Sequence, residues 1–169
     1  MVAIAEWTGY PETVSDEKDE IKVIARNRKA RYDYTIEETI EAGIELRGSE
    51  VKSMREGKIN ISDSYAIVEN GQVILRNLHI SPYKMASREQ PDPLRPRRLL
   101  LHRKEIRKLF AKTEQKGMTL VPLTVYFKGK HVKIELGLGV GRKKYDKRQA
   151  IAEAEAKRRI SRATRKDID

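Results

Sequence analysis

The sequence predicts a mainly β protein whose body is a small closed or partly closed β-barrel with two short helices. Three observations indicate this fold class. Five or six short apolar runs have the spacing of strands, turn signals join neighbouring runs as hairpins, and only two stretches within the body have helical spacing. A chain of 169 residues is long enough to bury one core and to carry tails outside it.

The body begins with two predicted strands. Residues 21–27, IKVIARN, are compatible with a strand, and residues 32–46 are rich in β-branched and aromatic side chains that alternate with polar ones. The second segment also contains a pattern that a helix could produce. Gly43, close to the end of the apolar pattern, favours a strand with a bulge or bend at that position.

A helix and the clearest hairpin of the chain come next. Residues 48–57 are predicted as a helix that Ser49 caps and Gly57 ends. The dipeptide Asn70-Gly71 then lies between two apolar runs, and this dipeptide favours a type I′ turn. We therefore expect a two-stranded hairpin here.

The second half of the body begins with a loop and a helix. Residues 87–98 contain three prolines and no core residue, so they are predicted as an exposed basic loop. Residues 99–117 are predicted as a helix whose apolar stripe is Ile106, Leu109 and Phe110.

A second hairpin is predicted to close the body. The apolar runs 118–127 and 130–139 flank the dipeptide Lys128-Gly129. Pro122 indicates an edge position or a strand start, because proline donates no hydrogen bond to a neighbouring strand. The glycine-rich stretch 137–141, GLGVG, lacks the third glycine of a nucleotide-binding loop and is followed by charges, so we interpret it as a β-bulge or as a hinge where the chain leaves the body.

The two ends differ from the body in composition. Residues 1–20 are acidic and without periodicity, which predicts a disordered arm, so the body spans residues 21–140. Residues 141–169 form a basic tail in which 148–166 has high helix propensity but few large apolar side chains. Isolated helices of this length are marginal in water, so we expect the tail to be disordered alone and helical on an anionic surface.

Composition narrows the function classes. With 36 Lys and Arg against 25 Asp and Glu, the formal net charge is +11, and the pI is near 9.8. This excess is typical of nucleic-acid binding; a solvated surface and an anionic membrane are weaker alternatives. No run approaches the roughly 18 to 20 apolar residues that span a bilayer, and no secretory signal is apparent, which predicts a cytoplasmic protein without membrane association.

No enzymatic chemistry is predicted. Cysteine is absent, which excludes thiolate metal sites and catalytic thiols. The three histidines lie in separate elements without paired spacing, and no nucleophile motif or phosphate loop is present. We therefore predict no catalytic residue, no metal and no cofactor.

A binding cluster is predicted near the start of the body. Residues 25–34, ARNRKARYDY, place four cations around Asn27 and beside two tyrosines. Cations bind phosphates, asparagine can contact base edges or sugars, and aromatic rings stack on unpaired bases. Packing on a strand face is the alternative for the tyrosines.

Several blocks of the sequence resemble the SmpB family, the SsrA-binding proteins of bacterial trans-translation. These blocks are NRKARYDYTIEETIEAGIELRGSEVKSMREGKINISDSY, NLHISPY, RRLLLHRKEI, LVPLTVYF and GRKKYDKR, in the family's order from about residue 27 to 148. The resemblance implies an OB-like barrel that binds the tRNA-like domain of tmRNA as a monomer, one per tmRNA. It also implies a tail that acts in the decoding centre and mRNA channel of a stalled ribosome and becomes helical there.

The resemblance also implies two sets of functional residues. The RNA-binding set is Asn27, Arg28, Lys29, Arg31, Tyr32, Glu41 and Leu100. The tail set, in which Gly141 is the expected hinge, is Gly141, Lys143, Lys144, Tyr145, Asp146, Lys147 and Arg148. Tyr32 and Tyr145 stand where the family often has histidine, so a role that needs imidazole protonation is not implied. A structural ribosomal or general RNA-binding protein is the alternative from the residues alone, and a nuclease or RNA-modifying enzyme would need clustered acids or histidines.

Overall fold

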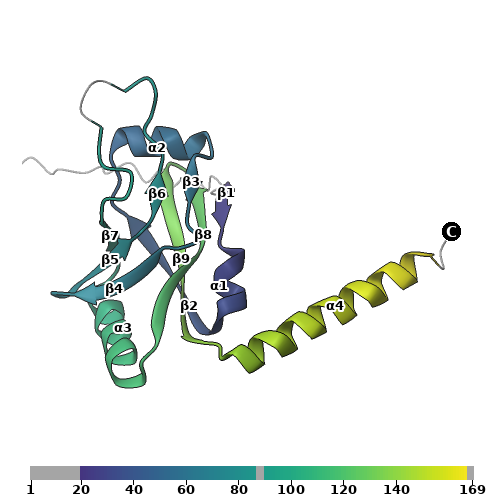
Figure 1. Cartoon of the computed structure of the whole chain (residues 1–169). Coiled ribbons are helices and arrows are strands. Elements are labelled where there is room, and N and C mark those ends of the chain that lie inside the picture. Colours follow the sequence, from purple (N-terminus) through teal and green to yellow (C-terminus); the bar gives the residue numbers. More distant parts are fainter. Residues whose placement is uncertain (1–19, 87–89, 167–169) are drawn as a thin grey trace, which may run out of the picture.

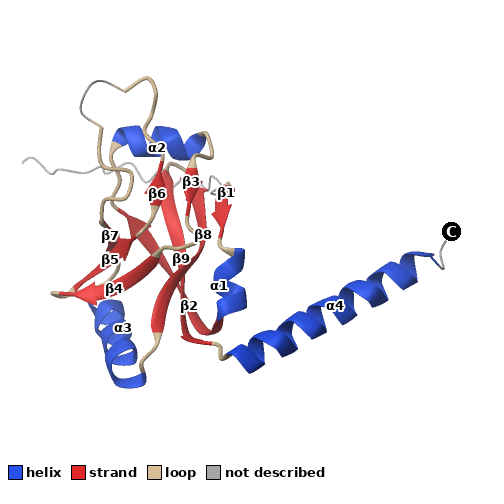
Figure 2. Ribbon diagram, viewed as in Figure 1, coloured by secondary structure: helices blue, strands red, loops and turns tan. Residues whose placement is uncertain are grey.

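The computed structural model describes residues 20–86 and 90–166, except for the side chains of 115–116, 144–147, 150 and 161–166. In chain order the elements are β1 (Ile21–Arg26), α1 (Arg28–Asp33), β2 (Tyr34–Ile44), α2 (Gly48–Arg55), β3 (Ile59–Asn60), β4 (Tyr65–Glu69), β5 (Gln72–Arg76), β6 (His79–Ile80), β7 (Arg97–Leu100), α3 (Arg103–Lys116), β8 (Thr119–Lys128), β9 (His131–Gly141) and α4 (Lys144–Lys166). Figures 1 and 2 show their arrangement. The predicted arm falls on residues outside this description except for Glu20, which is exposed.

All strand pairs of the main sheet are antiparallel. The series of neighbouring strands begins at β8 and leads back to β8. Neighbours run β8–β4–β5–β7–β2–β9, and β9 pairs again with β8. β1 pairs with β8 outside this circuit, and the two-stranded ladder β3–β6 stands apart from it. The prediction of a mainly β body is therefore confirmed.

Both predicted hairpins are present. Asn70 and Gly71 connect β4 to β5 with φ angles of 50° and 70°, the left-handed geometry that a type I′ turn requires. Lys128 pairs with His131, so β8 and β9 are joined by the two intervening residues. The first of these, Gly129, has a φ of 58°.

The register of β2 and β8 corrects two predictions. Gly43 pairs regularly with Lys133, so no bulge lies there; a methyl group at Gly43 would instead lie 3.2 Å from Cβ of Leu100 on β7. The irregularity of β2 falls between Ile36 and Glu38. Pro122 is in the interior of β8, at the register shift before Thr124, and not at an edge or a strand start. Bulges are the other place in a sheet where proline is accommodated.

The glycines of β9 allow its two neighbours to approach closely. A Cβ at Gly139 would lie 2.3 Å from the Thr35 carbonyl oxygen, and one at Gly137 would lie 2.9 Å from the Leu123 side chain. The extra residues in the register are on β2 and β8, so the predicted bulge within 137–141 is wrong. These glycines are needed for close packing of strands.

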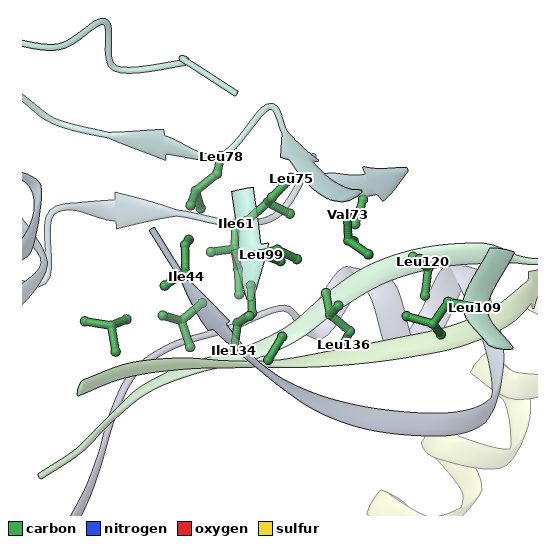
Figure 3. Close-up of a cluster of buried hydrophobic side chains, with 14 of the residues drawn as sticks. Ile44, Ile61, Val73, Leu75, Leu78, Leu99, Leu109, Leu120, Ile134 and Leu136 are labelled. Atoms are coloured by element: carbon green, nitrogen blue, oxygen red, sulfur yellow. The ribbon is translucent and has the colours of Figure 1, made fainter. Parts of the chain in front are cut away.

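The core lies between the strands of the main sheet, and it is mainly aliphatic, with Phe127 as its aromatic member. Figure 3 shows side chains from several strands converging there: Ile44, Val73, Leu75, Leu99, Leu120, Ile134 and Leu136. Met54 of α2 and Leu109 of α3 also belong to this cluster. These two helices lie at opposite ends of the sheet body (Figure 1), so each covers one end of the core.

Within the body, the structure describes three helices where the sequence predicted two short ones. Helix α1 was not predicted, and α2 begins at Gly48, with Arg47 and not Ser49 as its N-cap. Residues 97–100 form strand β7 between β5 and β2, so the predicted helix from residue 99 begins at Arg103. Phe110 of that helix is 51% exposed and does not belong to the buried stripe.

A buried ion-pair network between Glu50 and Arg97 connects α2 to strand β7. Arg97 is 0% exposed and donates from Nε and Nη2 to Glu50 Oε1 at 3.0 and 2.8 Å. Its Nη1 donates to the Leu78 carbonyl at 2.6 Å, and Arg95 Nε also donates to Glu50 at 3.0 Å. Burial would raise the pKa of Glu50, but the hydrogen bonds from Arg95 and the Arg47 backbone and the charge of Arg97 hold that pKa below its ordinary value.

Helix α4 extends away from the body as a single rod (Figure 1). Its described side chains are exposed, including Ile151 at 43% and Ile160 at 67%. The predicted helix of the tail is therefore present, and its predicted disorder in the free protein stays a prediction. Among the described residues, no helix combines the length and apolar character that crossing a bilayer requires.

Candidate nucleic-acid interface

The predicted RNA-binding cluster lies on helix α1, which Asn27 holds in place. Asn27 is 3% exposed, and its Oδ1 accepts the Ala30 N–H at 2.9 Å as the helix N-cap. Its Nδ2 donates to the Ile61 carbonyl at 3.1 Å, and its backbone N–H donates to the Leu123 carbonyl at 2.8 Å. Asn27 therefore caps α1 and ties it to the loop after β3 and to β8, while its side chain faces the protein interior.

The inner side of α1 is apolar, although the helix is only six residues long. Ala30 is buried against Val121 and Leu123 of β8, and Tyr34 and Ile36 of β2 pack beside them. The packing alternative is thus correct for Tyr34, which is half-buried. Tyr32 is 39% exposed. With its inner side seated in this way, α1 displays its basic residues outward.

The exposed side of α1 carries the predicted cations. Arg28 and Arg31 line a hollow of about 530 Å³ together with Arg26, Thr124 and Glu135. On the other side of α1, Lys29 pairs with Asp63 at 2.9 Å, and this hydrogen bond and charge raise the pKa of Lys29. The cluster therefore offers three arginines around one hollow, the side-chain chemistry that binds RNA phosphates.

Glu41 belongs to a second polar cluster, on the exposed face of β2. It accepts a hydrogen bond from the Tyr126 hydroxyl, and Lys128 and Lys133 approach the same carboxylate at 3.7 and 3.9 Å. The hydrogen bond and then the two lysines lower the pKa of Glu41, and burial with the Glu41 hydrogen bond raises the pKa of Tyr126. Glu41 is thus ionised at neutral pH and orients one phenol and two cations.

Leu100 adjoins this second cluster. It is 51% exposed, and it lies against Gly43 at the junction of β7 and β2. A hollow of about 310 Å³ lies between Leu100 and the basic side of the β8–β9 turn, lined there by Lys130, His131 and Lys133. A nucleotide has a flat base and an anionic backbone, so it fits an apolar surface with cations beside it.

The predicted RNA-binding residues therefore form two groups and not one. Asn27, Arg28, Lys29, Arg31 and Tyr32 belong to α1 and its cap, next to Tyr34 at the start of β2. Glu41 and Leu100 lie near the other end of β2, where Gly43 pairs with Leu100. The two groups nevertheless adjoin, because Glu41 pairs with Glu135 of β9, and Glu135 also lines the arginine hollow beside α1.

The tail residues begin where β9 ends. Gly141 pairs with Tyr34 as the last residue of β9, and it is not one of the glycines with positive φ. The next residue is still attached to the body, because the Arg142 N–H donates to the Asp33 carbonyl at 2.8 Å. Lys143 and Arg148 are exposed. The side chains of the other predicted residues, Lys144, Tyr145, Asp146 and Lys147, lie outside the described part, although their backbone begins α4.

Sequence reasoning missed three members of the second cluster: Tyr126, Lys128 and Lys133. A signal for them was available in the predicted hairpin. With a two-residue turn after Lys128, the alternation of strands places Tyr126 directly opposite Lys133. Their position beside Glu41 could not be inferred in the same way, because it depends on the pairing of β2 with β9, far apart in the chain.

Comparisons with known proteins agree on one family. The family model described as SmpB protein matches residues 24–166. The SsrA-binding protein of Halothermothrix orenii is 61% identical over 146 residues, 86% of this chain and 94% of that protein. The SsrA-binding protein of Acetivibrio thermocellus is 57% identical over 151 residues, 89% of this chain and 98% of that protein.

A solved structure extends this agreement to three dimensions. It is described as "tmRNA-SmpB: a journey to the center of the bacterial ribosome", and it matches with a TM-score of 0.61 at 48% sequence identity. The match covers 77% of this chain and 94% of the other chain.

Proposed function

The chain belongs to the SmpB family, and on that premise we propose that it binds the tRNA-like domain of tmRNA and delivers it to stalled ribosomes for trans-translation. Its partners are tmRNA and the ribosome. The observation that carries the proposal within the molecule is α1, whose inner side is buried and whose outer side presents arginines around a hollow. This arrangement displays positive charge on a rigid support, as binding of structured RNA requires.

We assign the predicted residues to two kinds of role. Arg28, Lys29 and Arg31 contact phosphates, and Tyr32 beside them offers a ring for stacking. Asn27 acts by positioning α1, because its side chain is buried and hydrogen-bonded to Ala30 and Ile61.

In the second cluster, Leu100 offers an apolar surface to a base or sugar. Glu41 acts through the residues it holds: it fixes Tyr126 and two lysines, and the lysines supply the phosphate contacts. A carboxylate would repel phosphate if it acted alone.

The body acts as an OB-like closed barrel in this proposal. Support comes from the circuit of pairings that returns to β8 and from the mainly aliphatic core. Closure leaves few free strand edges and fixes the position of the two RNA-binding groups relative to one another. We place the boundary between body and tail after Arg142, because its N–H is bonded to Asp33.

The tail acts on the ribosome and not on tmRNA. The predicted tail began at Gly141; we begin it at Lys143, because Gly141 and Arg142 are bonded to the body. Lys143 lies at the exit from the body, Lys144, Tyr145, Asp146, Lys147 and Arg148 lie at the decoding centre, and the rest of the tail lies in the mRNA channel. Support comes from the exposure of α4, which has no core to bury and carries many cations. In free solution this helix is marginal and exchanges with disordered chain. The protein is a cytoplasmic monomer, one per tmRNA, and it is an RNA-binding protein without enzymatic activity.

The experiment separates body from tail. Asp146, Lys147 and Arg148 are replaced together by alanine, and two quantities are measured: tmRNA affinity by gel shift, and tagging of a nascent chain on a message without a stop codon. We expect tmRNA binding close to wild type and tagging abolished. A matched control replaces Glu153, Lys157 and Arg158, which removes the same number of acids and cations further along α4, and it should retain more tagging. Normal tagging by the first variant would disprove the decoding role.

The alternative is a structural ribosomal protein whose basic tail is permanently bound to ribosomal RNA. It predicts co-sedimentation with ribosomes in cells that lack tmRNA. Sequencing of the RNA that co-purifies with an affinity-tagged form of this protein distinguishes the two functions. One dominant tmRNA supports the proposal, and ribosomal RNA alone supports the alternative.

A further inference from the structure

The arm at the start of the chain has a composition that the proposed function does not use. Residues 1–20 hold six acidic side chains and one lysine, a net side-chain charge of −5, whereas the whole chain has a net charge of +11. Five of the six acids fall within residues 12–20, and Trp7 and Tyr10 precede them. The arm therefore combines carboxylates with two flat aromatic rings.

The arm is joined to the body beside the second polar cluster. Strand β1 begins at Ile21, and Ile21 pairs with Lys128 of β8. Lys128 precedes the two-residue turn between β8 and β9, and Lys130 of that turn lines the hollow next to Leu100. Glu20, the last residue of the arm, is exposed. The attachment thus brings the acidic end of the arm close to the lysines of the second cluster.

The lysines of this cluster have too few acidic partners to balance their charge. Lys128 and Lys133 share the carboxylate of Glu41, at 3.7 and 3.9 Å. Among residues 20–86 and 90–166, no ion pair of Lys130 is found. Three lysines against one carboxylate leave a net charge of +2, which favours an anionic ligand.

The hollow beside these lysines has an apolar lining. Leu100 is 51% exposed there, and Leu46 and Val51 line the same space. The ring of a tryptophan or tyrosine is flat and mainly apolar, as a base is, and a carboxylate carries negative charge, as a phosphate does. The arm therefore offers this hollow the two kinds of contact that a nucleotide offers.

The arm is long enough to reach the hollow. Neighbouring strands lie about 4.8 Å apart, so the path from β1 across β8 and β9 to the hollow beside β2 is roughly 15 Å long. Trp7 precedes Ile21 by 14 residues, and the ends of a flexible chain of this length are roughly 19 to 22 Å apart. A tethered ligand reaches its highest effective concentration when its span matches the distance to its site. The tether therefore favours a ligand from the same chain.

We propose that the arm occupies the Leu100 hollow in the free protein, with the Trp7 ring on Leu100 and the acids of residues 12–19 on the three lysines. RNA then has to displace the arm before it can contact the second cluster. The arm thus lowers the affinity of the free protein for RNA by the fraction of molecules in which the hollow is open. This competition rests on the proposed function, which assigns the second cluster to tmRNA, whereas the docking of the arm does not depend on it.

The first measurement follows Trp7 in the full-length protein without RNA. Because Trp7 is the one tryptophan of the chain, acrylamide quenching of tryptophan fluorescence reports on the arm alone. The test variant replaces the lysines of the cluster: Lys128→Gln, Lys130→Gln and Lys133→Gln. The matched control makes the same change of charge on α1: Arg28→Gln, Lys29→Gln and Arg31→Gln.

We expect Trp7 of the wild type to be protected from quenching relative to the urea-unfolded chain. The lysine variant should lose most of this protection, and the α1 variant should keep it. Protection should also weaken as the salt concentration is raised, because salt screens the attraction between the acids and the lysines. It should not depend on protein concentration, since the ligand belongs to the same chain.

The second measurement is the affinity of full-length variants for tmRNA, by gel shift at low salt. Trp7→Ala changes no charge and should bind tmRNA about fivefold more tightly than wild type, a coupling typical of two linked sites. The same increase is expected when three acids of the arm are neutralised: Asp16→Asn, Glu17→Gln and Asp19→Asn. The control neutralises three exposed acids elsewhere and should change the affinity much less: Glu114→Gln, Glu153→Gln and Glu155→Gln.

Four results would overturn the inference. Quenching of wild-type Trp7 equal to that of the unfolded chain would show that the arm does not dock. Loss of protection only in the α1 variant would place the arm on α1, and protection that grows with protein concentration would make the hollow a contact between two copies. Unchanged tmRNA affinity in Trp7→Ala would show that the arm does not compete with RNA. Failure of the wild-type chain to bind tmRNA selectively would count against the proposed function, and the quenching of Trp7 would still test the docking.

Discussion

Strand β9 and helix α4 follow one another in the chain, yet they keep their shapes for different reasons. In β9 the side chains of Ile134, Leu136 and Leu138 are buried, and both strand edges are paired. In α4 the described side chains are exposed, and local propensity favours the helix. The comparison teaches that one chain can join a strand held by buried packing and two paired neighbours to a helix whose described side chains are all exposed.

The largest expected effect on the free energy of unfolding comes from the buried ion-pair network of the body. Replacing Glu50 by Gln removes the carboxylate that Arg97 needs, and an uncompensated buried arginine costs about 3 to 5 kcal/mol of the free energy of unfolding. Urea unfolding followed by tyrosine fluorescence measures this loss. The control Glu45→Gln removes an exposed partner of Arg98 and should change that free energy by at most about 1 kcal/mol.

The same network predicts how stability depends on pH. Because the folded-state pKa of Glu50 is below its unfolded value, the stabilisation is present above the unfolded pKa and is lost as the pH falls through the folded one. Wild type should therefore lose more stability than Glu50→Gln between pH 5 and pH 3. Parallel curves for the two proteins over this range would show that Glu50 is not the group responsible.

The close approach of strands at β9 gives the next largest effect. In Gly139→Ala the added methyl group meets the Thr35 carbonyl, and relief of this overlap needs a backbone shift that costs about 1 to 3 kcal/mol. Thermal unfolding measures the change. Gly48→Ala is the matched control, because no atom lies within 4 Å of the position of its Cβ, and it should be neutral or stabilising in α2.

Substitution of Asn27 tests whether this residue supports RNA binding by stabilising α1. Asn27→Ala removes the N-cap of α1 and leaves the Ile61 carbonyl without this donor, a loss of about 1 to 2 kcal/mol in stability. Affinity for tmRNA should fall while the salt slope stays nearly constant, because no phosphate contact is removed. Asn60→Ala, which removes an exposed turn contact to Ser62, is the control. Weaker RNA binding at unchanged stability would mean that Asn27 contacts RNA directly.

The smallest expected effect on body stability comes from the tail. Proline in place of Ala154, inside α4, costs that helix about 3 kcal/mol, but the free energy of unfolding of the body should not change. Circular dichroism should show less helix, and the unfolding midpoint of the body should equal that of wild type. Tagging on stalled ribosomes should nevertheless be lost. A shifted midpoint would show that α4 packs on the body.

The parts of this fold that could be predicted were those with local signals. The Asn70-Gly71 turn needs two residues with positive φ, and the residues that favour this geometry can be recognised in any chain. Helix α1 has no such signal: Ala30 is its only buried residue, and the helix depends on a cap and on a seat formed by Val121 and Leu123. Its six residues are too few to show a periodicity.

Long-range pairing explains the other errors. Leu99 appears helical when only its neighbours are considered, but it pairs with Ile44 and Val73 from two different strands. Pro122 appears to be an edge residue, yet it is tolerated within β8 because the register shifts there. For the site, the residue types could be predicted, whereas the place of Glu41 beside Tyr126, Lys128 and Lys133 depends on the long-range pairing of β2 with β9.

The order in which the strands pair has a consequence for synthesis of the protein itself. Ile21 at the start of β1 pairs with Lys128, 107 positions later, and Tyr34 pairs with Gly141. At about 5 to 20 residues per second, translation leaves the first strand without its partner for roughly 5 to 20 s. Because β9 joins both β2 and β8, a nascent chain released before His131 lacks this strand, and the edges of β2 and β8 that β9 covers stay open. A message truncated before the codon for His131 is therefore expected to yield an aggregation-prone fragment and not a partly active RNA-binding product.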